Sequence, residues 1–271
     1  MKKILFPTDF SDNAMNALRY TAQLAQEADA ELIILHAMHI PAIDGNAPID
    51  SSAEIIEDQK NLCKNKLSEL VDKVNQEVGI EPTSITDFGF AVDLICSTAK
   101  EMNVDLVAMG TKGAGNILEQ LLGSVTAGVA KKSTRPVMAI PVGTKFSTPK
   151  IVAFATDLSD NDAEEIRAFS DLLDQFDPEL HVVHVEVNEK LAQLPGHHHV
   201  SKVVDEYDRI KRVELKADDV EHALEDYVIR DKVDIMAVKR HNRGFFENLF
   251  HSSITTKMAY HTHVPLVIYH D

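Results

Sequence analysis

Short apolar runs alternate with longer amphipathic segments along the chain. The runs at 32–35 (LIIL) and 105–109 (DLVAM) are almost continuously apolar, which is typical of parallel strands buried on both faces. Between 11 and 28, apolar positions recur at helical spacing instead. The pattern predicts strands at 2–7, 31–37, 83–88, 104–109 and 136–141, separated by helices at 11–28, 52–78, 90–102 and 119–133.

The segment at 52–78 is the longest of the predicted helices. Ser51 and Glu54 have the spacing of a capping box, so we expect the helix to begin there. Its apolar positions recur at helical spacing and are expected to be buried; they are Ile55, Leu62, Leu67, Leu70 and Val74.

The chain contains an internal repeat. KILFPTDFSDNA from Lys3 is similar to KIVAFATDLSDND from Lys150, and Asp9 aligns with Asp157 at an offset of 148. Later segments, such as Asp105 against Asp234, align at an offset of 129. The second copy therefore lacks 19 residues (148 − 129), which fall largely in its counterpart of the long helix.

Strands and helices that alternate with short connections indicate a doubly wound α/β fold with right-handed crossovers. We expect two tandem doubly wound domains, each with a mainly parallel sheet of about five strands flanked by helices. The small and polar residues at 143–149 (GTKFSTP) are typical of a linker. They predict domains at 1–144 and 148–271.

Composition narrows the classes of function. The chain is 44% apolar and 26% charged, as globular proteins are, and its net charge of −16 makes nucleic acid an unfavourable partner. It contains no apolar stretch of the roughly 18 residues that span a membrane. Its start, MKKILFPTDF, turns polar at Thr8 and Asp9, so the apolar part is too short for a secretory signal. We therefore expect a cytoplasmic protein that binds no membrane. Cys63 and Cys96 have neither disulfide nor zinc spacing.

Several histidines attract attention as candidate ligands. His197–His199 are common types of zinc ligand, but three consecutive side chains do not readily converge on one ion, and a loop is the preferred interpretation. His36 and His184 lie at ends of apolar strands and are expected to be hydrogen-bonded core residues. His261 and His263 are expected near a surface or a domain contact.

The stretch MGTKGAGNILEQLLGSVT, at 109–126, is the strongest candidate for chemistry. Gly110 and Gly113 lack a Cβ, so backbone N–H groups can approach an anion, and Gly123-Ser124 lies where a helix N-terminus would attract phosphate. Glycines after a strand are, alternatively, ordinary turn residues, and neither the dinucleotide fingerprint nor the P-loop pattern occurs. The spacing Gly110-x2-Gly113-x9-Gly123-Ser124 resembles the nucleotide-binding pattern of the universal stress protein family.

The resemblance extends over both copies. Members of that family have five-stranded α/β domains and commonly dimerise through the last strand, and one branch binds ATP. The resemblance implies that Asp9 accepts a hydrogen bond from the adenine amino group. Alternatively, Asp9 caps the first helix. Mg²⁺ held through the phosphates would accompany the nucleotide. The residues implied to surround ATP are Pro7, Thr8, Asp9, Ala37, Met109, Gly110, Lys112, Gly113, Gly123, Ser124, Val125 and Thr126.

The second copy departs from this pattern. At the offset of 129, its three motif glycines become Lys239, Asn242 and Ser252. We expect these side chains to fill the space for a phosphate, so the second copy should not bind ATP in the manner of the family. The last strands, 137–140 and 266–269, are expected to pair within the chain as a pseudo-dimer, which is compatible with a further homodimer.

Three functions remain open from the sequence. The preferred one is a nucleotide-dependent stress-response regulator that binds ATP in its first domain. The alternatives are a slow ATP hydrolase, for which only Lys112 offers a candidate charge, and a scaffold that acts without nucleotide. No nucleophile set or paired carboxylates can be identified from spacing, so we expect no dedicated catalytic residues.

Overall fold

The fold is taken from a computed structural model that describes residues 1–38, 49–111, 123–158, 162–186, 197–206, 209–240 and 264–270. The strands are β1 Lys3–Pro7, β2 Glu31–Met38, β3 Thr83–Phe88, β4 Leu106–Gly110, β5 Val137–Ile140, β6 Ile151–Thr156, β7 Glu179–Glu186, β8 Ile210–Lys216, β9 Ile235–Arg240 and β10 Leu266–His270. The helices are α1 Asp12–Glu27, α2 Ile49–Val78, α3 Ala91–Glu101, α4 Ser124–Lys132, α5 Asp162–Leu172, α6 His197–Glu206 and α7 Val220–Asp231, with a 3-10 turn, η1, at Asp174–Phe176.

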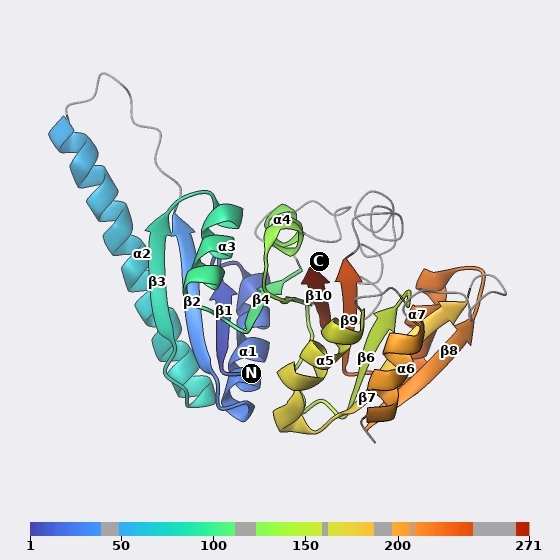
Figure 1. Ribbon diagram of the computed structural model, residues 1–271. Coiled ribbons are helices and arrows are strands. Elements are labelled where there is room, and N and C mark those ends of the chain that lie inside the picture. Colours follow the sequence, from blue (N-terminus) through green and yellow to red (C-terminus); the bar gives the residue numbers. More distant parts are fainter. Residues whose placement is uncertain are drawn as a thin grey trace.

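The strands form one sheet in the order β3-β2-β1-β4-β5-β10-β9-β6-β7-β8 (Figure 1). Each half contributes five parallel strands, β1 to β5 from the first half and β6 to β10 from the second. The predicted α/β class and the two five-stranded units are confirmed. The two units share a sheet because their last strands pair.

The pairing of β5 with β10 is antiparallel and joins the halves. Met138 lies opposite Val267, and Ala139 and Val137 lie opposite Leu266 and Ile268. Met138 and Val267 are also equivalent at the offset of 129, so the register relates the halves by a pseudo-two-fold axis at this pair. The predicted pseudo-dimer within one chain is confirmed.

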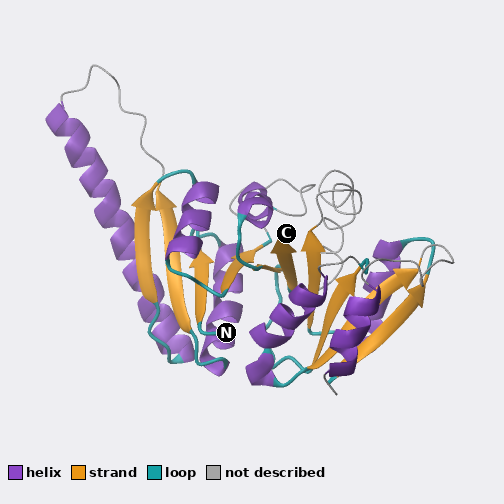
Figure 2. Ribbon diagram, in the orientation of Figure 1, coloured by secondary structure: helices purple, strands orange, loops and turns teal. Residues whose placement is uncertain are grey.

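Helices cover both faces of the sheet (Figure 2). One layer of buried side chains combines one face of the sheet with α1, α2, α5 and α6, and the other combines the opposite face with α3, α4 and α7. Successive strand residues alternate between the layers, as Ile4 and Leu5 do. Both layers draw on both halves, so the core is continuous across the junction.

The longest helix differs from the prediction at its start. Its backbone is helical from Ile49, so Ser51 and Glu54 lie inside α2 and the predicted capping box is wrong. Leu67, Leu70 and Val74 are buried as predicted, whereas Leu62 is 56% exposed. A helix of 30 residues is about 45 Å long, which exceeds the strands it covers, and Figure 1 shows its start projecting past the tips of β2 and β3.

The segment His197–His199 was predicted as a loop, and this prediction is wrong, because α6 begins at His197. Val200 and Val203, one turn apart, are buried against the sheet, and burying this pair favours helix over loop. The described residues contain no group of three or more His, Cys, Asp or Glu that could hold a metal ion.

The halves share the same arrangement where the first strand of each begins. Asp105 Oδ2 accepts from the N–H groups of Lys2 and Lys3 at 2.6 and 2.9 Å. Asp234 Oδ2 accepts from Lys150 and Ile151 at 2.7 and 3.0 Å. A carboxylate before the fourth strand therefore fixes the first strand in each half.

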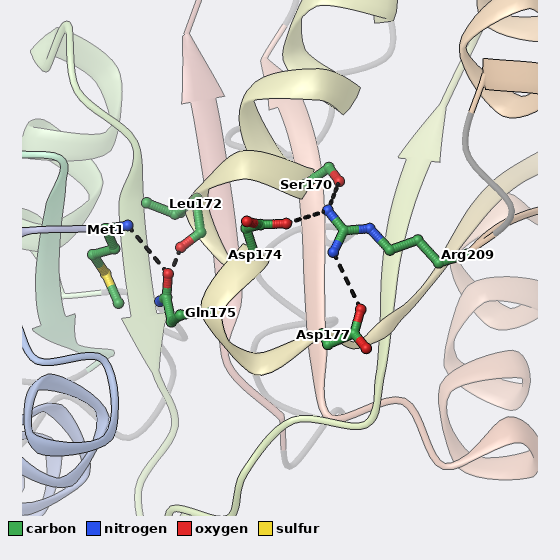
Figure 3. A network of polar contacts seen from close by, with 7 residues as sticks. All are labelled: Met1, Ser170, Leu172, Asp174, Gln175, Asp177 and Arg209. Atoms are coloured by element: carbon green, nitrogen blue, oxygen red, sulfur yellow. Dashed lines mark hydrogen bonds and ion pairs between the residues drawn. The ribbon is translucent and has the colours of Figure 1, made fainter.

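One hydrogen bond at η1 joins the N-terminus to the second half, beside a polar network within that half (Figure 3). The Met1 amino group donates to Gln175 Oε1 at 3.2 Å, and the Gln175 amide donates to the carbonyl of Leu172. Arg209 donates a hydrogen bond to Ser170 and forms ion pairs with Asp174 and Asp177 of η1 and its end.

Across the described residues, every helix is too short or too polar to cross a lipid bilayer.

Candidate functional site

The topology places a switch point between β1 and β4. The chain passes from β1 to β2 and β3 on one side of the sheet, and then returns to place β4 on the other side of β1. In open α/β sheets, ligands bind beyond the carboxyl ends of the strands at such a point. Pro7 ends β1 and Gly110 ends β4, so the candidate residues gather where this rule predicts a ligand.

The segment after β1 is held in a tight turn. Thr8 donates its N–H to Leu35 O at 2.8 Å, and its buried hydroxyl accepts from Phe10 N at 3.0 Å. This turn holds Phe10 at a positive φ of 63°. Asp9, at the corner of the turn, is exposed, so its carboxylate can meet a ligand.

Asp9 does not cap α1. The N-cap is Ser11, whose hydroxyl accepts from Ala14 N at 3.2 Å, whereas Asp9 Oδ1 accepts from Ser11 N at 3.0 Å. The alternative that Asp9 is the helix cap is therefore wrong. Its carboxylate supports the turn and leaves the capping to the next polar residue.

The end of β2 supports the same turn. His36 is half-buried, and its Nδ1 lies 2.8 Å from Thr8 O, so this nitrogen carries the proton and donates. This confirms the prediction of a hydrogen-bonded core histidine. Ala37 is half-buried beside it and aligns with Asp87 of β3. Ala37 lies near the carboxyl end of β2, and its methyl group occupies little space there.

Two hydrogen bonds place the start of α4 on the end of β4, and a third joins that end to β5. Thr111 donates to Ile140 O at 3.0 Å and accepts from Gly123 N at 2.6 Å. Thr126, which is buried, donates its hydroxyl to Gly110 O at 2.9 Å. The ends of the intervening segment are thereby brought together. Lys112 and Gly113 lie in that segment and outside the described residues.

Among the described residues, no side chain caps the N-terminus of α4, which faces the carboxyl ends of the strands. Gly123 is its N-cap and provides no side-chain acceptor, and its first turn contains no acidic residue. Ser124 and Val125 are exposed, whereas Thr126 is buried, so the start of α4 is partly accessible. The first N–H groups of a helix have no partner within the helix. The helix begins at Ser124 rather than at 119, and residues 119–122 lie outside the described part of the chain. The helix start expected at Gly123-Ser124 is confirmed.

Two of the candidate residues, Met109 and Thr126, are buried and support the site through packing and hydrogen bonding. Met109 is 5% exposed and packs in the layer of α3 and α4. The Thr126 hydroxyl is engaged by Gly110, which makes it a positioning group for α4 in this structure. Sequence reasoning missed Thr111, because nothing in a strand-to-loop pattern indicates which backbone groups will close the loop.

The second half repeats the turn but has no glycine at the end of its fourth strand, β9. Thr156 accepts from Leu158 N at 2.9 Å, and His184 Nδ1 lies 2.9 Å from Thr156 O, as Thr8 and His36 do in the first half. At the position of Gly110, however, stands Lys239, which is 2% exposed and pairs with Asp162 and Glu165 of α5. Asn242 and Ser252 lie outside the described residues.

Sequence reasoning identified Lys239 as a replacement but missed its carboxylate partners. Asp162 and Glu165 are three residues apart, on the side of α5 that also carries Ile166 and Phe169. Two acidic residues beside an apolar stripe were a signal that a buried cation faces them.

Comparisons with known proteins agree with this architecture. A sequence model described as "Universal stress protein family" matches residues 1–141. Universal stress protein MJ0577 of Methanocaldococcus jannaschii is 35% identical over 155 residues, covering 51% of this chain and 94% of that protein. Universal stress protein Slr1230 of Synechocystis is 23% identical over 99% of this chain and all of its own length.

A solved universal stress protein from Archaeoglobus fulgidus has the same two-unit fold. It superimposes with a TM-score of 0.75 at 23% identity, covering 99% of this chain and 98% of that one. MJ0577 matches half of the chain, whereas Slr1230 matches 99% of it. This is the relation expected between proteins with one copy of a domain and proteins with two.

Proposed function

The chain belongs to the universal stress protein family, as a tandem two-domain member, and from this premise we propose that its first half binds ATP and acts as a nucleotide-dependent regulator of a stress response in the cytoplasm. The observation that carries the proposal is the uncapped start of α4, tied to Gly110 at the switch point. Backbone N–H groups there offer a triphosphate neutral donors and the positive end of the helix dipole.

The roles of the residues follow from their placement. The exposed Asp9 carboxylate accepts from the adenine amino group, and the small Ala37 leaves space beside the base. Ser124 and the N–H groups of its turn bind phosphate, with Lys112 and Gly113 contributing from the connecting segment. Mg²⁺ would be held mainly by phosphate oxygens and water. The proposal assigns this role to the domain at 1–144.

The proposal is tested by equilibrium titration of the full chain with ATP. We expect one site per chain, and the symmetry of the halves supplies matched controls. Gly113→Val should abolish binding, whereas Asn242→Val, at the equivalent position, should not change it. Asp9→Ala should weaken binding roughly tenfold to a hundredfold through loss of a charged hydrogen bond, and Asp157→Ala should leave it unchanged. Absence of binding at millimolar ATP would refute the proposal.

For the domain at 148–271 we propose a role that does not depend on nucleotide. The support is Lys239, whose side chain extends to α5 from the position that Gly110 occupies in the first half. Lys239 thus replaces the first glycine of the pattern with a side chain that is buried against α5. Mass spectrometry of the denatured protein should detect no more than one retained nucleotide per chain, and a second one would contradict this role.

A further inference from the structure

The second half contains a buried polar cluster where the first half is apolar. The side chain of Lys239 extends from β9 to α5. Tyr269 of the neighbouring strand β10 aligns with Lys239 in the sheet. Both are nearly inaccessible, with 2% and 6% exposure, and Asp162 is 1% exposed, whereas the Glu165 side chain is 17% exposed. Their counterparts at the two offsets are small or apolar, namely Ala14, Ala17, Gly110 and Ile140 for Asp162, Glu165, Lys239 and Tyr269.

The contacts within this cluster are ion pairs and one short hydrogen bond. Lys239 Nζ lies 3.2 Å from Glu165 Oε1 and 3.7 Å from Asp162 Oδ1. Asp162 Oδ2 also accepts from the Thr156 hydroxyl at the end of β6. Asp162 therefore has both a cation and a hydroxyl donor, whereas Glu165 shares the cation.

Counted over the described residues, the cluster has more negative than positive charge. Two carboxylates there face one ammonium, and burial makes an excess charge costly. Within the described part of the chain, Glu165 Oε2 and Tyr269 Oη are buried without a hydrogen-bond partner. The Tyr269 ring is fixed between Phe154 and Phe169, so its hydroxyl cannot easily turn away.

We propose that this cluster is a buried proton-binding site, in which Glu165 takes up one proton from solvent as the pH falls and the second half becomes more stable as a result. The proton binds a carboxylate oxygen, which becomes neutral, and Lys239 remains paired with Asp162. The neighbours of Glu165 among the described residues fit this assignment. Asp162 lies on the same helix, Lys239 on β9 and Tyr269 on β10, while α6 contributes Val200 and Val203 to the core beside α5.

The electrostatics of Glu165 support the assignment. Burial raises the pKa of its carboxyl group, the nearby Asp162 raises it further, and Lys239 opposes the shift without cancelling it. Burial together with the charges of Glu165 and Asp171 also raises the pKa of Tyr269 far above its ordinary value, so the phenol stays protonated. Because the fold raises the pKa of Glu165, the protonated form is stabilised at low pH, and that stabilisation is lost as the pH rises through the folded-state value.

The direct test is carboxyl NMR of the full chain with ¹³C-labelled glutamate. The variant Glu165→Gln identifies the Glu165 resonance by its loss, and Glu164→Gln, on the exposed side of the same turn, identifies a matched control. We expect Glu165 to titrate at a higher pH than Glu164. Titration at the same pH or lower would overturn the proposal. If Glu165→Gln does not fold, backbone-based assignment in the parent protein gives the same comparison.

Stability gives an independent readout. We compare the unfolding constants of the parent and of Glu165→Gln at pH values between the unfolded-state and folded-state pKa values of Glu165. As the pH rises through this range, the constant of the parent should increase relative to that of the variant by up to about tenfold per pH unit. The ratio of the parent to Glu164→Gln should stay flat. A flat ratio for Glu165→Gln would overturn the proposal.

Lys239→Met sharpens the test. The Lys239 ammonium favours the ionised carboxylate, so its removal should move the titration of Glu165 to still higher pH. A downward shift or no shift would show that Glu165 does not sense this cluster. None of these measurements involves ATP, so the proposal stands or fails separately from nucleotide binding in the first half.

Discussion

The two halves have the same backbone framework but opposite chemistry at the ends of their strands. Thr8 and His36 in the first half have the same hydrogen bonds as Thr156 and His184 in the second. Where the first half has Gly110, the second has a lysine paired with two carboxylates. The comparison teaches that shared hydrogen bonds maintain the framework in both halves, whereas the residue at the end of the fourth strand differs and changes what packs against the next helix layer.

The largest expected effect comes from transferring the lysine. Gly110→Lys would place a cation against Ala14 and Ala17, which supply no carboxylate, and an unpaired buried charge costs about 3–5 kcal/mol. We expect urea unfolding to show this loss and ATP binding to disappear. Gly110→Ala is the control for side-chain volume. The triple variant Gly110→Lys, Ala14→Asp, Ala17→Glu should recover part of the stability but not binding, and a stable single variant would contradict the comparison.

A smaller effect, equal in the two halves, is expected where their first strands begin. Asp105→Ala and Asp234→Ala each remove an acceptor of two backbone N–H groups. Each should cost about 2 kcal/mol, because hydrogen bonds to a charged group are stronger than neutral ones. Asp→Asn at either position retains one carbonyl acceptor and should cost less. Losses that differ strongly between the halves would show that the framework is not equivalent.

The histidines separate framework from function. His36→Phe and His184→Phe keep a ring but remove one hydrogen bond each, which is worth about 1 kcal/mol. Thermal unfolding should show similar losses. Only His36→Phe should also weaken ATP, because His36 supports the turn that presents Asp9. Equal effects of both variants on ATP affinity would break the proposed division between the halves.

The smallest effect is expected on α2, which greatly exceeds its second-half counterpart in length. Arg19 pairs with Glu77 at 3.0 Å, but both side chains are substantially exposed. Glu77→Gln should change the free energy of unfolding by no more than about 0.5 kcal/mol, and raised salt should reduce the difference. A larger loss would mean that α2 depends on this pair more than on the burial of Leu67 and Leu70.

Particular residues show how far prediction from sequence reached. The helical spacing of apolar residues between 11 and 28 predicted a helix with one face on the sheet, and Leu18 and Leu24 of that segment are buried. Helical spacing failed for Leu62, since the pattern carries no information about where the sheet ends. At the candidate site it indicated Gly123 as a helix start, but not the bond from Thr126 to Gly110, which joins residues on two different elements.

The sequence by itself determined the repeat, the alternation of strands and helices, and the difference between glycine and lysine at the ends of β4 and β9. These features are local, since they depend on the spacing and type of neighbouring residues. Only the tertiary structure decided that Asp162 and Glu165 meet Lys239, and that Ser11 rather than Asp9 caps α1. Which groups come within hydrogen-bonding or ion-pairing distance depends on how separate elements pack, and spacing along the chain does not encode that distance.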